Sequence, residues 1–248
     1  MGTDVLAATT VLTPDPDSLD VAVDLRDRLR GWGLGERRQG GRPTCSVFAV
    51  VGALEFAAAS RRGRGERLSV EFANYAAHKH CGRSEDGGFF SEIWDGFAAY
   101  GACPEETLPY QQAFDATLEP PSEALEAAAP LKDLGLRLAW IKEWNPETGV
   151  TEDQLAEIRR VLREGWPVCG GFRWPKQATW EANVLQVVPP EEVFDGHSIL
   201  LIGYAEPKEG SGDGLFLTRD SGGDGRDRYV PFEHARRYMN DAAWISHD

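Results

Sequence analysis

Two residues of this sequence could form a nucleophile and its base. Cys45 follows Pro43 and opens the run CSVFAVVGALEFAAA, which is apolar on every side and predicts a helix enclosed by protein. A cysteine in the first turn of a helix has its sulfur at the positive end of the helix dipole, which stabilises the reactive thiolate. His197 opens the run HSILLIGYA, a pattern that places it at the mouth of a strand, within reach of a helix terminus. Each residue also has an ordinary alternative as a core cysteine or a structural histidine.

Asp220 is a candidate third member of this group. It lies at the end of the next predicted strand, GLFLTRDS, and its carboxylate could accept a hydrogen bond from the imidazole and fix its tautomer. An aspartate before Ser221 and two glycines is equally common as a turn former. The segment 78–81, HKHC, has no second pair of soft ligands at zinc-site spacing, so we expect neither a metal site nor a cofactor.

The elements that must position these residues divide the chain into a helical part and a strand-rich part. Helices are predicted over 45–59, 69–78 and 91–101, with Ser69 and Ser91 as N-caps. A further helix is predicted behind the capping box that runs from Thr151 to Gln154. Strands are predicted over short apolar or alternating runs, which are LRLAWIKEW, PVCGGFRW, HSILLIGYA, GLFLTRDS, DRYVPF and AAWIS. The sequence therefore predicts an α+β protein with an antiparallel sheet.

Composition limits the partners of the protein. The 248 residues include 40 acidic and 26 basic side chains, a formal net charge of −14 that repels phosphate backbones and anionic lipid surfaces. We expect no nucleic-acid partner and no membrane partner. No stretch has the roughly 20 continuous apolar residues of a membrane span, and four cysteines are few for a disulfide-stapled chain. These features favour a cytoplasmic protein with reduced thiols.

Several short motifs resemble those of the papain family of cysteine peptidases. Gln39-Gly40 lies six residues before Cys45, as the oxyanion glutamine of that family lies before its nucleophile. Gly196-His197 with Gly203-Tyr204 resembles the family's histidine strand. The resemblance extends along most of the chain through Val23-Asp24-Leu25-Arg26, Leu68-Ser69-Val70-Glu71, Asp86-Gly87-Gly88, Pro109-Tyr110, Gly165-Trp166-Pro167-Val168 and Asp220-Ser221.

The resemblance implies a two-lobe fold with the active site in the cleft between the lobes. Residues 1–20 would form an N-terminal strap and residues 21–248 one catalytic domain. Its helical lobe would cover about 21–115 and its antiparallel, strand-rich lobe about 130–248.

The resemblance also implies roles for the candidate residues. Cys45 would attack a carbonyl carbon as a thiolate, His197 would protonate the leaving group, and Asp220 would orient His197. The backbone N–H of Cys45 and the Gln39 amide would bind the oxyanion.

The same resemblance places a peptide substrate beside four further residues. Gly87 and Gly88 would offer bare backbone to an extended peptide, and Phe90 would shape a pocket for one of its side chains. Gly196, next to the histidine, would also contact the substrate. A simple tight turn is the alternative for the two glycines.

The sequence departs from the family pattern around the predicted triad. Asp220 stands where the family has asparagine, which should favour protonated His197. Ser46 replaces the aromatic residue that normally follows the nucleophile. Gly222 replaces the tryptophan that covers the histidine–asparagine bond, so we expect this bond to be wetter here.

Two family cysteines that pair in a disulfide are also replaced, and Arg42 and Glu85 stand at their positions. A second bridge between Cys81 and Cys103 stays open, because their separation in space cannot be read from the sequence.

The predicted function is hydrolysis of peptide or amide bonds in a peptide or protein substrate. The residues before Val21 are fewer than the family's inhibitory propeptide. We therefore expect narrow specificity, control by a regulatory partner protein, or recruitment to another acyl transfer such as ligation. The alternative from a different class is a catalytically retired fold that binds peptides or serves as a scaffold.

Overall fold

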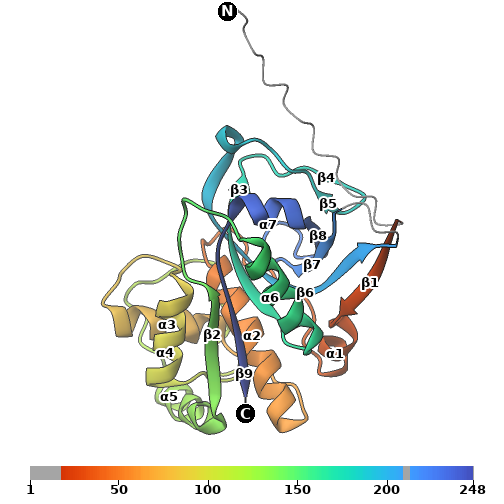
Figure 1. The fold of residues 1–248 in the computed structure, drawn as a ribbon. Coiled ribbons are helices and arrows are strands. Elements are labelled where there is room, and N and C mark those ends of the chain that lie inside the picture. Colours follow the sequence, from red (N-terminus) through yellow and green to blue (C-terminus); the bar gives the residue numbers. More distant parts are fainter. Residues whose placement is uncertain (1–17, 209–212, 248) are drawn as a thin grey trace, which may run out of the picture.

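The structure is a computed structural model that describes residues 18–208 and 213–247. Residues 1–17, most of the predicted N-terminal strap, lie outside these described residues. Figure 1 shows a large sheet, a group of helices on one side of the molecule and further helices packed against the strands. The predicted α+β class is therefore confirmed.

The helices follow the predicted order with three additional α-helices. In chain order they are α1 (Arg26–Gly31), α2 (Cys45–Arg62), α3 (Val70–Cys81), α4 (Phe90–Tyr100), α5 (Ser122–Ala128), α6 (Glu152–Arg163) and α7 (Phe232–Tyr238), with short 3₁₀ turns η2 (Ala129–Leu134) and η3 (Pro190–Glu192). Almost every residue of α2 from Cys45 to Ala59 is buried, as its apolar sequence predicts. The helix ends at Gly63, which adopts the left-handed conformation that glycine allows at low cost.

The sheet has the order β2-β9-β3-β6-β7-β8-β5-β4, and β1 pairs with β6 outside this path. Its strands are β1 (Leu19–Asp24), β2 (Leu136–Lys142), β3 (Val168–Pro175), β4 (Trp180–Glu181), β5 (Val184–Leu185), β6 (Val193–Pro207), β7 (Leu215–Arg219), β8 (Asp227–Pro231) and β9 (Met239–His247). All described pairs are antiparallel except β5 with β8. The sheet thus brings the last strand, β9, beside β3.

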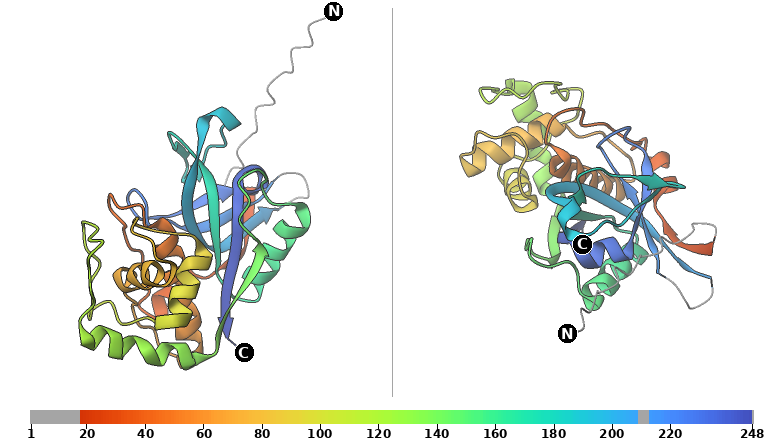
Figure 2. Two further views of the ribbon diagram at one scale, coloured as in Figure 1. Left: turned by 90° about the vertical axis from the view of Figure 1, so that its left-hand side faces the viewer. Right: turned by 90° about the horizontal axis from the view of Figure 1, so that it is seen from above.

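Helices cover both faces of this sheet. On one face α2 packs against β6 and β9, with Leu54 and Phe56 in the same apolar cluster as Leu200 and Ile245. On the other face α6 and α7 contribute to a second cluster around Phe172. Figure 2 shows α2 to α5 on one side of the strands and α6 on the other. Among the described residues, no helix has both the length and the hydropathy that a membrane crossing needs.

Local sequence signals located the start of α6 correctly and misplaced the start of α4. The capping box of Thr151 and Gln154 is confirmed at α6. Helix α4 begins at Phe90 rather than after Ser91, because the Glu92 carboxylate accepts the N–H of Phe89 at 2.9 Å and so caps the earlier turn.

Helix α7 lies in a region read from the sequence as strands and their connections. Pro231 precedes its first turn, where the missing N–H of proline costs nothing. Its buried residues Phe232, Ala235 and Tyr238 recur every three positions, which is a helical spacing. Helix α5 likewise was not predicted, and it lies between the two predicted lobes, in the stretch from about 115 to about 130.

Candidate active site

Cys45 is the first residue of α2, as predicted, and lies between the helices and the sheet. Its side chain is 8% exposed. Thr44 occupies the N-cap position but makes no capping hydrogen bond, and its hydroxyl instead lies 2.7 Å from that of Tyr110. The Tyr110 hydroxyl in turn donates to the carbonyl of Gln39 at 2.9 Å. Tyr110 therefore ties the Gln39 loop to the start of α2.

His197 lies within β6 and not at the mouth of a strand, which corrects the sequence prediction. Phe172 on β3 pairs with His197, whereas the next residue, Arg173, pairs with Asp195. Gly196 is thus the extra residue of a β-bulge, and its φ of +101° is a conformation that favours glycine. A bulge re-aims the neighbouring side chain, which here lets His197 leave the regular sheet pattern and face Cys45.

Asp220 follows β7 and lies next to the imidazole of His197, on the side away from Cys45. His197 Nε2 lies 2.9 Å from Asp220 Oδ1, and the backbone N–H of Gly222 donates to the same oxygen at 2.7 Å. A bond from Nε2 to Asp220 leaves Nδ1 for Cys45. The structure therefore brings together the three residues predicted as a triad.

The charges in this group reinforce one another. Burial opposes ionisation of Cys45, but the hydrogen bond and charge of His197, with the N–H groups of Ser198 and Ser46, lower the pKa of the thiol below its usual value. Burial alone would lower the pKa of His197, but its bonds and charge interactions with Asp220 and Cys45 raise this pKa to about 10. Both shifts favour a thiolate beside an imidazolium at neutral pH.

Gln39 is held close to this group by two segments. Its side-chain Nε2 donates to the carbonyl of Arg42 at 2.8 Å, and its Oε1 accepts from Ser221 Oγ at 2.8 Å. Its backbone N–H also donates to the Ser221 carbonyl at 2.9 Å. Because Ser221 follows Asp220, one turn fixes both the orienting carboxylate and the glutamine.

A cavity of about 310 Å³ opens beside Cys45 and His197, between the helical part and the sheet. The helical part supplies Pro43, Cys45, Ser46, Gly88, Phe89 and Phe90, and the sheet part supplies Trp144, Gly171, Phe172, Gly196, His197, Ser198, Asn240 and Asp241. Three of the predicted substrate contacts, Gly88, Phe90 and Gly196, are therefore among its walls.

Gly87 lies apart from these walls. Its N–H donates to Asn74 at 3.1 Å, and its carbonyl lies 2.9 Å from His78 Nε2. A Cβ at this position would lie 2.2 Å from the carbonyl oxygen of Pro43, and its φ is +82°. This geometry fits the tight-turn alternative, in which Gly87 lets the loop pass close to the residues before Cys45.

Sequence reasoning missed Asp241 and Trp144 as cavity residues. Asp241 lies on β9, next to Gly171 of β3 in the sheet, and Trp144 follows β2. No motif marks either residue. An aspartate within an otherwise apolar strand was the available signal for Asp241.

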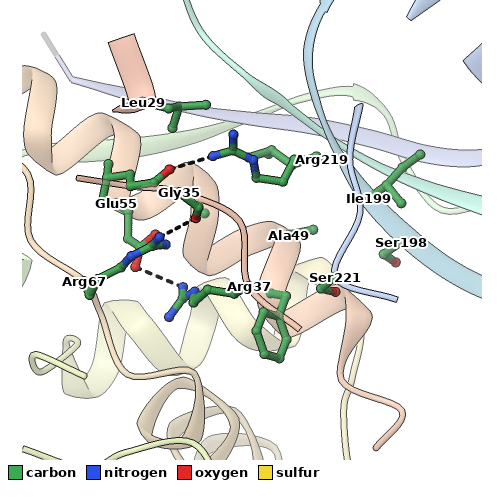
Figure 3. A pocket seen from close by; sticks show the side chains of 14 residues that line it. Leu29, Gly35, Arg37, Ala49, Glu55, Arg67, Ser198, Ile199, Arg219 and Ser221 are labelled. Carbon is green, nitrogen blue, oxygen red and sulfur yellow. Dashed lines mark hydrogen bonds and ion pairs between the residues drawn. The ribbon is translucent and has the colours of Figure 1, made fainter. Parts of the chain in front are cut away.

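A buried charge network supports α2 behind Cys45. Figure 3 shows Glu55 of α2 with Arg37 and Arg67 on one side of a small cavity of about 40 Å³. Arg37 donates to Glu55 at 2.9 Å, and the N–H of Leu68 donates to the same carboxylate at 2.8 Å. Ser198, next to His197, lies on the opposite side of this cavity. The network therefore ties α2, the helix that carries the cysteine, to the segments that contain Arg37 and Leu68.

Comparison with known proteins identifies this architecture. No protein-family model matches the sequence, and no curated protein matches it. Solved structures do match: xylellain, a cysteine protease from Xylella fastidiosa, has a TM-score of 0.69 and 20% identity over 96% of this chain and 91% of its own. Digestive procathepsin L 3 from the larval midgut of Tenebrio molitor has a TM-score of 0.62 and 18% identity over 96% of this chain and 72% of its own. The proform of Amb a 11, a ragweed pollen cysteine protease, has a TM-score of 0.62 and 20% identity over 96% of this chain and 67% of its own.

The chain has the papain-like fold. In this version of the papain-like fold, an ion-pair cluster joins the segments that the resemblance would join by a disulfide. Arg42 Nε and Nη2 each donate to Asp86 at 2.9 Å, and Nη1 donates to Glu71 at 2.6 Å. The acidic partners of Arg42 are therefore Asp86 and Glu71 and not Glu85, which is exposed and lies near Arg83.

The cysteines of this papain-like fold are all free. Cys81 is exposed at the end of α3, whereas Cys103 is buried beside Ser69. The open question of a Cys81–Cys103 bridge is thereby answered, because the two side chains lie in different surroundings.

A different tryptophan covers the histidine in this papain-like fold. Gly222 has no side chain to do so, but Trp174 of β3 packs its ring against His197 with centroids 4.7 Å apart. The side chains of His197 and Asp220 are only 13% and 11% exposed. The neighbouring strand thus supplies cover for the imidazole that Gly222 lacks.

Proposed function

We propose that this chain is a cysteine peptidase that cleaves peptide bonds through Cys45, His197 and Asp220. The observation that carries the proposal is the position of His197, which is bonded to Asp220 on one side, faces Cys45 on the other and borders an open cavity. A structural histidine would need neither the lowered thiol pKa nor access to a cavity.

The first half of the proposed reaction forms a thioester. The Cys45 thiolate attacks the carbonyl carbon of the scissile amide, and the carbonyl oxygen becomes an oxyanion. The N–H of Cys45, free in the first turn of α2, and the second Nε2 hydrogen of Gln39 donate to this oxyanion. The His197 imidazolium then gives its proton to the amide nitrogen, the C–N bond breaks and the amine leaves.

The second half releases the acid. Neutral His197 accepts a proton from a water molecule as the water oxygen attacks the thioester carbon. Collapse of the second tetrahedral intermediate breaks the C–S bond, which regenerates the thiolate beside the imidazolium. Asp220 keeps the imidazole oriented with Nδ1 toward Cys45 throughout both halves.

Alkylation by a papain-directed epoxide, followed by intact-protein mass spectrometry and peptide mapping, tests the nucleophile. We expect one rapid adduct at Cys45, which is lost in Cys45→Ala and strongly slowed in His197→Ala. Cys81 is an internal control, since it is exposed but its pKa is raised, first by desolvation and then by the nearby Glu92 and Asp95. Equal labelling of Cys45 and Cys81 would contradict the proposal and favour the peptide-binding alternative.

Cleavage itself is tested with a peptide library made by digesting a proteome. New termini produced by the wild-type chain, and not by Cys45→Ala, would support hydrolysis. An activated Cys45 without new termini would instead favour an acyl transfer to an acceptor other than water.

A further inference from the structure

One buried carboxylate of the cavity has no part in the proposed reaction. Asp241 is 5% exposed and lines the same cavity as Cys45 and His197. Its carboxylate lies over the backbone of Gly171, where a Cβ would be only 2.0 Å from Asp241 Oδ1. Only glycine at this position of β3 lets the carboxylate lie there, so two strands combine to place a negative charge in the cavity wall.

The structure gives Asp241 little compensation for its burial. Lys142 is the nearby cation, but its ammonium group donates to the carbonyls of Asn145 and Asn240. It acts on Asp241 through its charge and not through a hydrogen bond. Desolvation raises the pKa of Asp241 to about 7, although Lys142 and the N–H of Gly171 oppose this rise. A carboxylate in such a site gains free energy from any cation that enters the cavity.

The other walls suit the stem and the charge of a long cationic side chain. Phe90 and Phe172 are both buried, and Phe89 and Trp144 stand at the mouth with 45% and 51% of their surfaces exposed. The rings of Phe89 and Trp144 meet edge to face at 5.4 Å, one from each side of the cavity. Aromatic faces attract ammonium and guanidinium groups, and they also pack against methylene stems.

Among the described walls, His197 is the one group that carries a positive charge, and the Cys45 thiolate faces it. Besides the Cys45–His197 pair, Asp241 is the one titratable side chain among the described residues that line the cavity. Because the thiolate and the imidazolium offset each other, Asp241 is the wall residue whose negative charge is left for a ligand, and its cation Lys142 lies outside the walls. Its volume of about 310 Å³ lies at the lower end of the roughly 300–1,000 Å³ of ligand pockets and suits one side chain.

We propose that this cavity binds an arginine or lysine side chain of the peptide substrate, with Asp241 as the residue that selects its positive charge. The inference rests on the proposed peptidase function and names the substrate class of that site. Asp241 is a specificity residue, and it takes no part in bond breaking.

The test uses two peptidyl epoxides that differ only in arginine or citrulline, with this residue placed in turn at each of the two positions nearest the epoxide. Citrulline has the length of arginine but a neutral urea group. The rate of Cys45 alkylation is measured by mass spectrometry at about pH 8, above the pKa of Asp241. Since a hydrogen bond to a charged group contributes about 1.5–3 kcal/mol, we expect the arginine probe to react about 10- to 100-fold faster at one position.

Variants separate the charge of Asp241 from general effects. In Asp241→Asn, which keeps the shape, the ratio of the arginine rate to the citrulline rate should fall to about one. Asp241→Ser serves as a second variant should the asparagine variant fold poorly. Asp133→Asn removes one negative charge from an exposed position of η2 and should keep the preference.

The outcomes distinguish this inference from the proposed function. Rapid labelling of Cys45 by both probes at equal rates would overturn the inference and leave the peptidase proposal standing. A preference that survives in Asp241→Asn would overturn the role of Asp241. No labelling of Cys45 by either probe would contradict the peptidase proposal, and with it this inference.

Discussion

Trp174 and His197, neighbours on adjacent strands, pack with their ring centroids 4.7 Å apart. Trp174 lies on β3, and its ring is 7% exposed. Trp174 also contacts His234, which is fully buried. Desolvation lowers the pKa of His234 to about 3, so this second histidine is neutral at neutral pH. An apolar wall therefore encloses the imidazole on the side away from the cavity, and it supports the bond from His197 to Asp220.

Trp174→Ala should lower peptide cleavage by roughly 10-fold, a small part of the 10²–10⁴-fold that general acid–base catalysis contributes. Water would reach the His197–Asp220 bond, and the imidazole would gain freedom to turn. Trp174→Phe keeps an apolar ring and should recover most of the activity. Both the free energy of unfolding and the pH–rate profile of Trp174→Ala are measured. If Trp174 has only a structural role, the substitution lowers the free energy of unfolding and leaves the basic limb of the profile unshifted.

Asp220→Asn should shift the basic limb of Cys45 alkylation to lower pH. The charge of Asp220 helps raise the pKa of His197 to about 10, so the reactive ion pair persists until the pH rises through that value. Asparagine keeps a hydrogen-bonding group but removes the charge, which lowers the pKa of His197. We expect substantial activity near neutral pH and an earlier loss in base. An unchanged basic limb, or a folded but inert variant, would contradict this account.

Asp241→Asn should stabilise the protein above neutral pH. The pKa of Asp241 is about 7 in the fold against a usual 3.8, so between these values the folded state keeps a proton that the unfolded chain releases. The free energy of unfolding therefore falls as the pH rises from about 4 to about 7, and asparagine avoids this loss. The titratable groups facing Asp241 are Lys142, the Cys45–His197 pair and Cys169, whose thiol stays neutral because burial raises its pKa.

Urea denaturation at several pH values measures this effect. We expect Asp241→Asn to gain roughly 2–4 kcal/mol over the wild type at about pH 8 and almost nothing at about pH 4. Asp133→Asn is the control, and its stability should follow the wild type at every pH. A gain of equal size at both pH values would mean that packing, and not charge, separates the two proteins.

Arg42→Ala should destabilise the fold by about 3–5 kcal/mol, because it leaves the buried carboxylates of Asp86 and Glu71 without their cation. Arg42→Lys should recover only part of this loss, since an ammonium cannot reproduce the paired donors that Asp86 receives. Arg160→Ala removes an exposed arginine that pairs within α6 and should cost less than about 1 kcal/mol. Similar losses in Arg42→Ala and Arg160→Ala would show that the cluster adds little to stability.

The sequence by itself determined several of the elements and the residue types of the candidate site. An enclosed helix beginning at Cys45 follows from its apolar run and from Pro43, and the start of α6 follows from the capping box of Thr151 and Gln154. These signals lie within a few residues of one another, so local propensity and capping suffice to reveal them. Spacing and motif resemblance were enough to single out Gln39 and His197 as well.

The tertiary structure alone decided which residues cover the site and which residues line its cavity. Gly196 turns His197 out of the sheet pattern through a bulge, Trp174 replaces the missing cover, and Asp241 enters the cavity over Gly171. Each of these contacts joins residues far apart in the chain. Strand order and register set them, because β9 and β6 both pair with β3, and no local pattern of residues encodes which strands become neighbours.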